Sequence, residues 1–185
     1  MKIFLKIITI ISFGFLIESC KKDAGFTLDC TDPDAINYNP DATDDNGSCI
    51  FSNSYLLNGE WNITNIEYET EVLTQTISGE ANDAGFWSFQ YPENTCSNSL
   101  SFVTEGINIL GQTLPGFPID VSNNGTWGLS NNDNTLTITD DQTGAVSIYQ
   151  ILSVQENICF LEGQIQTEIL TMTYSVDVEM QLTKQ

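Results

Sequence analysis

The chain has 185 residues and a formal net charge of −20, and its length suits one domain plus a short additional module. Beyond the first nineteen residues its only basic residues are Lys21, Lys22 and Lys184. Nucleic-acid binding and arginine-based capture of phosphorylated ligands both need a cationic surface, so the sequence excludes both. The chain also lacks histidine, the usual general base of hydrolases and the commonest metal ligand. We therefore predict that the protein is not an enzyme.

Residues 1–19 have the features of a secretory signal peptide. Two lysines precede an apolar run over residues 7–17, which is too short to span a bilayer as a helix. The sequence of residues 16–20 resembles the lipobox of bacterial lipoproteins. This resemblance implies that Cys20 is lipidated and becomes the mature N-terminus. The alternative is an ordinary signal peptide followed by an incidental cysteine.

Residues 20–27 are expected to form a tether. The charged residues that directly follow Cys20 resemble the sorting or export signals of some bacterial outer-membrane lipoproteins. The resemblance implies an exported outer-membrane lipoprotein on the periplasmic or the cell-surface face. An acidic chain does not dock on anionic head groups, so we expect the N-terminal lipid to supply the membrane attachment.

Residues 28–50 form a separate acidic module bounded by Cys30 and Cys49. The module contains two prolines, an Asn-Gly turn and six aspartates, and it has almost no periodic apolar signal. Such a segment cannot build a core, so a disulfide is needed to hold it. A clip of this length contributes about 3 kcal/mol. The segment resembles a short cysteine-bounded module that occurs, often repeated, in secreted and surface proteins of bacteria.

The acidity of this module raises the question of calcium. Carboxylate and carbonyl oxygens are the ligands that Ca²⁺ prefers, whereas the spacing of an EF-hand loop does not fit here in register. Two interpretations of this module therefore remain: a calcium site, or a solvated acidic loop that the disulfide holds in place. No other cofactor is expected. The candidate ligands are Asp32, Asp34, Asp41, Asp44 and Asp45.

Four cysteines remain once Cys20 is assigned to the lipid. An even number in an exported chain predicts two disulfides. Sequence alone allows three connectivities, of which proximity favours Cys30–Cys49 and so leaves Cys96–Cys159. A zinc site formed by all four cysteines is the alternative, although the chain lacks a C-x-x-C pair.

Residues 55–185 are predicted to form an all-β domain. Residues 170–182 alternate strictly between apolar and polar side chains, which predicts one long strand with one buried face. A strand of about 40 Å usually bends around a barrel. Shorter alternations recur upstream between hairpin turns, which favours an antiparallel barrel or a sandwich. The apolar positions expected to share a face are Trp87/Phe89/Tyr91, Leu100/Phe102, Trp127/Leu129, Leu136/Ile138, Val146/Ile148 and Ile158/Phe160.

One short motif connects this domain with a known family. Gly59-Glu60-Trp61, at the start of the first strand, matches the G-x-W motif that opens lipocalins, and Gly125-Thr126-Trp127 resembles the middle of bacterial lipocalin-like lipoproteins. The resemblance covers residues 55–185 and implies an up-and-down, lipocalin-like β-barrel in which Gly59 and Trp61 are structural. Lipocalins typically pack an arginine of a late strand over the first tryptophan. Lys184 takes that place here if the last strand returns beside the first.

A closed sheet would turn the aromatic face of each strand inward. Small barrels fill their own interior, whereas eight-stranded barrels of this type can hold one small ligand, so these side chains are either core or pocket wall. The candidate pocket residues are Trp87, Phe89, Tyr91, Phe102 and Trp127.

Three functions compete at this stage. The preferred one is a lipid-anchored envelope protein whose barrel binds a small apolar ligand. The second is a structural or interaction lipoprotein with a filled barrel and an acidic, calcium-binding surface. The third is an enzyme that uses carboxylates such as Asp120, Glu156 and Glu162, which the sequence does not pair. The sequence identifies no protein partner.

Overall fold

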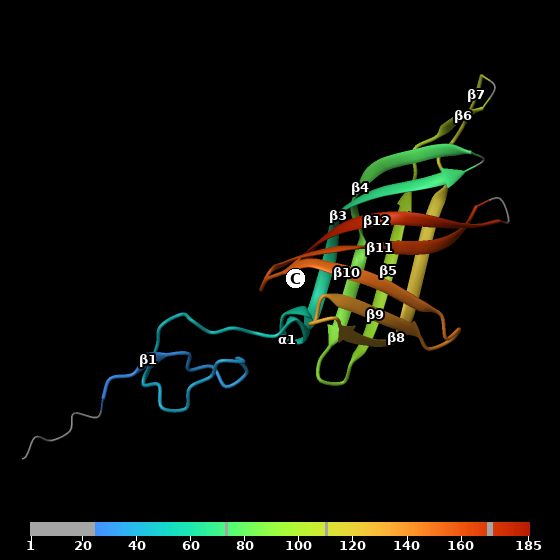
Figure 1. Ribbon diagram of the computed structural model, residues 1–185. Coiled ribbons are helices and arrows are strands. Elements are labelled where there is room, and N and C mark those ends of the chain that lie inside the picture. The colour runs from blue at the N-terminus through green and yellow to red at the C-terminus, as the bar shows by residue number, and fades with distance from the viewer. Residues whose placement is uncertain (1–24, 73, 110, 170–171) are drawn as a thin grey trace, which may run out of the picture.

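The computed structural model describes residues 25–72, 74–109, 111–169 and 172–185 (Figure 1). The expected signal peptide, Cys20 and most of the tether lie outside these ranges. None of the helices within them is long and apolar enough to cross a membrane.

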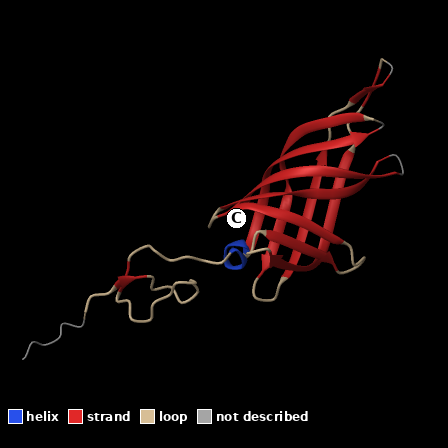
Figure 2. Ribbon diagram, in the orientation of Figure 1, coloured by secondary structure: helices blue, strands red, loops and turns tan. Residues whose placement is uncertain are grey.

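Eight antiparallel strands close into a barrel (Figures 1 and 2). Each strand pairs with the next strand of the barrel along the chain, and the last strand pairs with the first, so the sheet has no free edge. The predicted all-β, up-and-down antiparallel barrel is therefore confirmed. The strands are β3 (Gly59–Val72), β4 (Gln75–Gln90), β5 (Thr95–Val103), β8 (Pro118–Ser130), β9 (Thr135–Asp140), β10 (Val146–Val154), β11 (Ile158–Ile169) and β12 (Met172–Lys184).

Short elements lie outside the barrel sheet. A two-residue parallel pair, β1 (Leu28–Asp29) and β2 (Asp44–Asp45), belongs to the N-terminal module. Helix α1 (Asn53–Leu57) precedes β3, and the Ser52 side chain caps it by accepting a hydrogen bond from the Tyr55 N–H. The hairpin of β6 (Ile107–Ile109) and β7 (Gln112–Leu114) lies at the opposite end of the barrel from α1 (Figure 1).

A β-bulge in β3 decides which side chains enter the barrel. Against β12, strand β3 carries one extra residue, Thr64, whereas against β4 Thr64 lies opposite two unpaired residues, Asp83 and Ala84. Before the bulge Trp61 and Ile63 are buried, and after it the buried positions are Ile66, Tyr68, Thr70 and Val72. The bulge thus moves the inward face from odd to even positions.

The long alternation at the C-terminus forms β12, as predicted. Its apolar positions from Val176 to Leu182 are buried, whereas Met172 at the start of the strand is exposed. Residues 170 and 171, where the alternation begins, lie outside the described ranges.

Two other predicted faces are wrong. Val146 and Ile148 point away from the barrel and are 58% and 54% exposed, and β10 buries Tyr149 and Ile151 instead. In β11 the deeply buried positions are Cys159 and Leu161, the neighbours of the predicted pair Ile158 and Phe160. These strands carry apolar residues at consecutive positions, so alternation alone does not identify the inner face.

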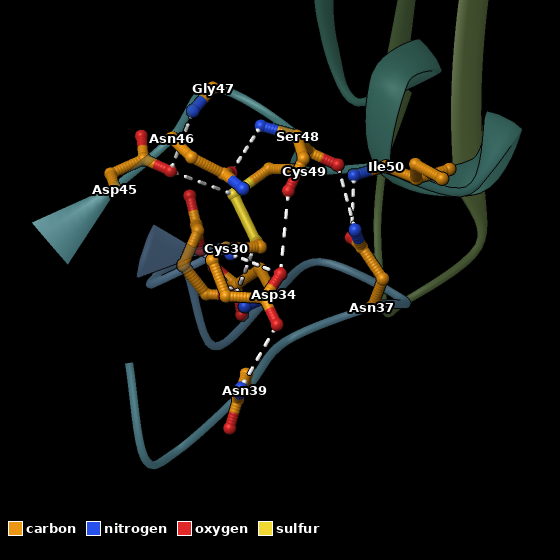
Figure 3. The surroundings of a disulfide bond; sticks show 12 residues. Cys30, Asp34, Asn37, Asn39, Asp45, Asn46, Gly47, Ser48, Cys49 and Ile50 are labelled. Carbon is orange, nitrogen blue, oxygen red and sulfur yellow. Dashed lines mark hydrogen bonds between the residues drawn. A yellow bond between two sulfur atoms is a disulfide. The ribbon is translucent and has the colours of Figure 1, made fainter. Parts of the chain in front are cut away.

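The N-terminal module is closed by the predicted disulfide between Cys30 and Cys49 (Figure 3). Hydrogen bonds hold the two ends of the loop together. Asn37 donates from Nδ2 to the Ser48 carbonyl at 2.7 Å and accepts from the Ile50 N–H at 2.8 Å. Side-chain hydrogen bonds and the disulfide therefore stabilise this module in place of the hydrophobic core of a larger domain.

The second predicted disulfide is wrong, because Cys96 and Cys159 are free thiols. Cys96 lies on β5 and Cys159 on β11, and three strands separate β5 from β11 in either direction around the barrel. The two cysteines thus occupy opposite walls, while a disulfide requires Cα atoms within about 7 Å. The four-cysteine zinc alternative is also wrong, since Cys30 and Cys49 are bonded to each other.

Both free thiols are expected to be unreactive in the folded protein. Burial raises the pKa of Cys159 to about 12, and burial together with the Asp141 carboxylate raises the pKa of Cys96 to about 11. At pH 8, iodoacetamide should modify them at least about a hundredfold more slowly than a model thiol, because the thiolate is the nucleophile.

Mass spectrometry of a chain carrying Cys20→Ser should show two modified thiols only after unfolding without reductant. Two rapidly modified thiols in the folded chain would contradict their burial, and none after unfolding would contradict their placement on opposite walls.

Candidate functional site

The Gly59-x-Trp61 motif closes the α1 end of the barrel. Trp61 is fully buried, and its indole N–H donates to the Leu57 carbonyl at 2.7 Å. Strand β12 returns beside β3 and places Lys184 opposite Trp61, with the Lys184 ammonium 5.2 Å from the ring centroid. Gly59 has φ of +123°, and a Cβ there would lie 2.9 Å from Lys184 Cε, so glycine suits both the backbone and the space.

Lys184 is thus the cationic partner of Trp61, because the last strand returns beside the first. Its ammonium also donates to the Leu56 carbonyl at 3.2 Å, which ties the last strand to α1. Desolvation lowers the pKa of the Lys184 ammonium. The Glu156 carboxylate raises this pKa, but its effect is smaller. These contacts give Gly59 and Trp61 a structural role.

Three of the five predicted pocket residues form one aromatic cluster inside the barrel. The rings of Trp87, Phe89 and Trp127 are buried, and a fourth ring, that of Tyr149, completes the cluster. The Trp87 centroid lies 5.3 Å from Phe89 and 5.1 Å from Tyr149, and the Phe89 centroid lies 5.4 Å from Trp127. The rings therefore pack against one another in the edge and tilted geometries that aromatic pairs prefer.

The other two predicted pocket residues lie elsewhere. Phe102 is buried and packs against Tyr68 with the ring centroids 5.0 Å apart. Tyr91 is 42% exposed, because β4 ends at Gln90 and the chain turns before Tyr91 can enter the barrel. The assignment of Tyr91 to the pocket is wrong. Tyr149 and Tyr68 take part in the aromatic interior, although neither was a candidate.

The three tryptophans differ in one respect that matters for binding. The indole N–H groups of Trp61 and Trp127 donate to backbone carbonyls, of Leu57 and Gln90 respectively. Trp87 is only 2% exposed, yet its Nε1 has no partner, and it is the single buried side-chain polar atom of this kind within the described ranges. An unpaired buried donor costs about 1–3 kcal/mol, so this group needs an explanation.

The end of the barrel opposite α1 is covered by the base of the β6–β7 hairpin. Ile107 is buried in the core, and Leu114 and Phe117 are partly buried against it. The Glu105 N–H donates to the Tyr68 hydroxyl at 2.8 Å, and the Phe117 N–H donates to the Thr104 hydroxyl at 2.9 Å. The hairpin is thereby fixed to the inner wall of the barrel.

A groove of about 1080 Å³ runs along the outer face of β10, β11, β12, β3 and β4. We call it the outer groove. Four glutamates on adjacent strands stand directly opposite one another along it, in the register order Glu162, Glu179, Glu67 and Glu80. We call this row the glutamate ladder. Side chains directly opposite in a sheet are neighbours, and like charges in such positions destabilise it.

A second acidic row lies two residues further along the same strands. It consists of Gln164, Asp177, Glu69 and Ser78, and Gln164 donates from Nε2 to the Asp177 carboxylate at 2.6 Å. Lys184, the only basic residue after Lys22, lies over Trp61 and does not line the groove. The carboxylates of the outer groove therefore have no counter-charge from the described part of the chain.

The aspartates of the N-terminal module form turns. Asp32 accepts from the Asp34 N–H at 2.9 Å, and Asp45 accepts from the Gly47 N–H at 3.1 Å. Nowhere in the described ranges are three or more acidic, cysteine or histidine side chains arranged to hold a metal ion. The calcium site, with Asp41 and Asp44 among its candidate ligands, stays a prediction.

A different aspartate organises this module. The Asp29 carboxylate accepts from Asn39 Nδ2 and from the Cys30 N–H, both at 2.9 Å, and also from the Ser48 hydroxyl. The bond from Asn39 is the main cause of a lowered pKa of Asp29. Asp29 cannot be distinguished from the other five aspartates of the module by sequence alone, because its role depends on contacts across the disulfide loop.

The carboxylates of the enzyme hypothesis are distributed over different parts of the barrel. Asp120 lies on β8 and accepts from the Ser101 hydroxyl at 2.6 Å, Glu156 lies in the turn before β11, and Glu162 belongs to the glutamate ladder. Asp120 and Glu156 do not line the outer groove. The structure gives no reason to treat these three residues as one catalytic group.

Neutralising the middle of the glutamate ladder should stabilise the fold. Glu67→Gln removes one charge between Glu179 and Glu80 without changing side-chain size. We expect the Tm to rise by roughly 1–2 °C at low ionic strength. The gain should shrink in high salt, which screens exposed charges.

The matched control is Glu71→Gln on the same strand, because Glu71 stands opposite Thr76 on β4. Thermal unfolding followed by circular dichroism at two salt concentrations measures both variants. An equal rise for Glu71→Gln, or a lower Tm for Glu67→Gln in low salt, would show that the cross-strand charges do not repel as the register implies.

Comparison with known proteins gives only distant similarities. No protein-family model and no curated protein matches the chain. Among solved structures, a deswapped triple mutant of bovine odorant-binding protein is 12% identical, with a TM-score of 0.34 over 70% of this chain and 74% of that one. A complex of bovine odorant-binding protein with a selenium-containing odorant is 11% identical, with a TM-score of 0.36 over 72% of this chain and 73% of that one. Such values transfer no function to this chain.

Proposed function

We propose that this protein is a non-catalytic binding protein whose barrel takes a small, mainly apolar molecule carrying one hydrogen-bond acceptor. The observation that carries the proposal is the unpaired indole N–H of Trp87 in a mainly apolar interior. Ligand sites of this type are mostly apolar and contain a few polar groups that orient the ligand. A carbonyl or ether oxygen of the ligand would accept the Trp87 hydrogen bond.

The surroundings of Trp87 suggest where such a molecule would fit. The Tyr149 ring stands edge-on to Trp87 and lies over Gly163, where a Cβ would collide with the ring. In this proposal a shift of Tyr149 makes room beside the indole without moving the sheet. The ligand is then small, with its apolar part against Phe89 and its acceptor at Trp87 Nε1.

A pair of probes that differ only in the acceptor tests this proposal. We expect 2-nonanone to bind about tenfold more tightly than nonane, which corresponds to one net hydrogen bond. Trp87→Phe should remove this preference. Trp127→Phe is the matched control, because the Trp127 indole N–H already donates to the Gln90 carbonyl. Isothermal titration calorimetry of the two probes with the three proteins measures the preference.

A filled barrel is the second candidate function, and the ring–ring packing of the aromatic cluster favours it. The barrel would then be a rigid support for surfaces that contact other molecules. In that case neither probe binds, and Trp87→Phe raises the stability because it deletes a donor that nothing satisfies.

We also propose that the protein is exported and anchored to the outer membrane through a lipid on Cys20. The signal-peptide pattern of residues 1–19 and the lipobox-like residues 16–20 support this assignment. The Cys30–Cys49 disulfide agrees with an oxidising compartment. In this arrangement residues 20–27 are the tether, residues 28–50 the acidic module and residues 55–185 the barrel domain.

Cys20→Ser tests the anchor. Without the thiol that takes the lipid, the chain should stay unprocessed or appear as soluble protein, because the acyl chains supply the membrane affinity. Cys96→Ser is the control, since its thiol lies in the barrel wall and should not affect fractionation. Membrane and soluble fractions are compared by immunoblot. Unchanged membrane association and mobility of the Cys20→Ser chain would rule out the lipid anchor.

A further inference from the structure

The outer groove presents two kinds of side chain that a folded, monomeric barrel does not need on its surface. The first is the glutamate ladder, whose four charges stand side by side without a cation opposite them. The second is an apolar pair on β10, Val146 and Ile148, which line the same groove and are 58% and 54% exposed. The acidic residues and the apolar pair form one continuous concave face.

We infer that the outer groove is a docking surface for an extended cationic polypeptide segment with apolar residues between its basic ones. Charge complementarity argues for the cation, because the groove has carboxylates on β11, β12, β3 and β4 and no basic residue among its lining residues. The exposed Val146 and Ile148 argue for apolar side chains in the same partner. This surface lies on the opposite side of the barrel wall from Trp87, so it is independent of the proposed ligand site.

The spacing of the groove fits an extended chain. Neighbouring strands lie about 4.8 Å apart, so the glutamate ladder spans roughly 14 Å across the sheet. The second row, with Asp177 and Glu69, lies two residues further along the strands and therefore about 7 Å away. Alternate side chains of an extended peptide share one face and are also about 7 Å apart, so side chains at every second position would meet successive rows. Basic and apolar side chains must both occupy such positions to contact the carboxylates and the apolar pair together.

A metal ion is a poorer occupant of this groove than a polypeptide. No three acidic groups in the described ranges converge on a point where one ion could bind. A single ion would also leave Val146 and Ile148 exposed and most of the 1080 Å³ groove empty. Several cationic groups on one chain match the distributed carboxylates and the apolar pair together.

The test uses two fluorescent nine-residue peptides of identical composition. One alternates lysine and valine at every second position, with serine between them, so that both share one face of the extended peptide, and the other carries the lysines as one block. The mature full-length chain should bind the alternating peptide more tightly than the block peptide in a fluorescence-anisotropy titration. Added salt should weaken this binding, because the contacts are exposed and electrostatic.

Two triple variants separate the groove from overall charge. Glu67→Gln with Glu162→Gln and Glu179→Gln removes three charges from the glutamate ladder. Glu93→Gln with Asp133→Asn and Asp141→Asn removes three charges from exposed turns outside the groove. We expect the ladder variant to lose about tenfold or more in affinity and the turn variant less than about twofold.

Ile148→Ser should also weaken the alternating peptide, although it changes no charge, and Trp87→Phe should leave peptide binding unchanged. Equal losses in the two triple variants, no preference between the two peptides, or no effect of Ile148→Ser would overturn the proposal. Thermal melts of each variant confirm that the fold persists. If the protein binds the peptide but shows no preference for 2-nonanone over nonane, only the proposed ligand site at Trp87 is overturned.

Discussion

The pairing of β12 with β3 is the constraint on which the rest of the structure depends. It closes the sheet, brings Lys184 over Trp61, and sets the register that aligns Glu179 with Glu67. The extra residue Thr64 sits within this pairing, and its hydroxyl donates to the Gln181 carbonyl at 3.2 Å. The same local feature thus controls the closed end of the barrel and the outer face.

The bulge reconciles two demands that a regular strand could not meet. Trp61 must face inward to close the barrel, while Glu67 and Glu69, an even number of residues further on, must face outward. In an unbroken strand residues of the same parity share one face, so these glutamates would enter the apolar interior. Burying unpaired carboxylates there would be prohibitive. The extra residue Thr64 therefore allows β3 to carry both the buried Trp61 and the exposed glutamates.

The sequence allows the class of fold to be predicted because alternation and turns are local signals. Two such local signals, the Gly59-Glu60-Trp61 motif and the long C-terminal alternation, lie on the first and the last strand of the closed sheet. Strands with apolar residues on both faces were harder. In β10 the pair Val146 and Ile148 alternates as regularly as the buried pair Tyr149 and Ile151, and only the closed sheet distinguishes inside from outside.

Features that depend on register could not be predicted. The separation of Cys96 from Cys159 follows from the order of strands around the barrel, and the glutamate ladder follows from pairings between distant segments. Whether an indole N–H finds a hydrogen-bond acceptor also depends on residues distant in sequence, since the carbonyl that accepts from Trp127 belongs to Gln90. Single-sequence patterns carry no information about such contacts. The interior candidates were therefore correct as inward-facing aromatics, apart from Tyr91, but the one unpaired donor among them could not be recognised.

Closure by β12 also has a consequence for the way the chain folds. Thr70 on β3 donates to the Ser175 carbonyl on β12, a contact between residues 105 positions apart. Contacts this distant in sequence make folding slow, because the entropy of closing the loop is lost before the pairing is gained. The first strand of the barrel has no partner on one side until β12 has been synthesised. Until then the sheet cannot close, so β3 remains a free edge.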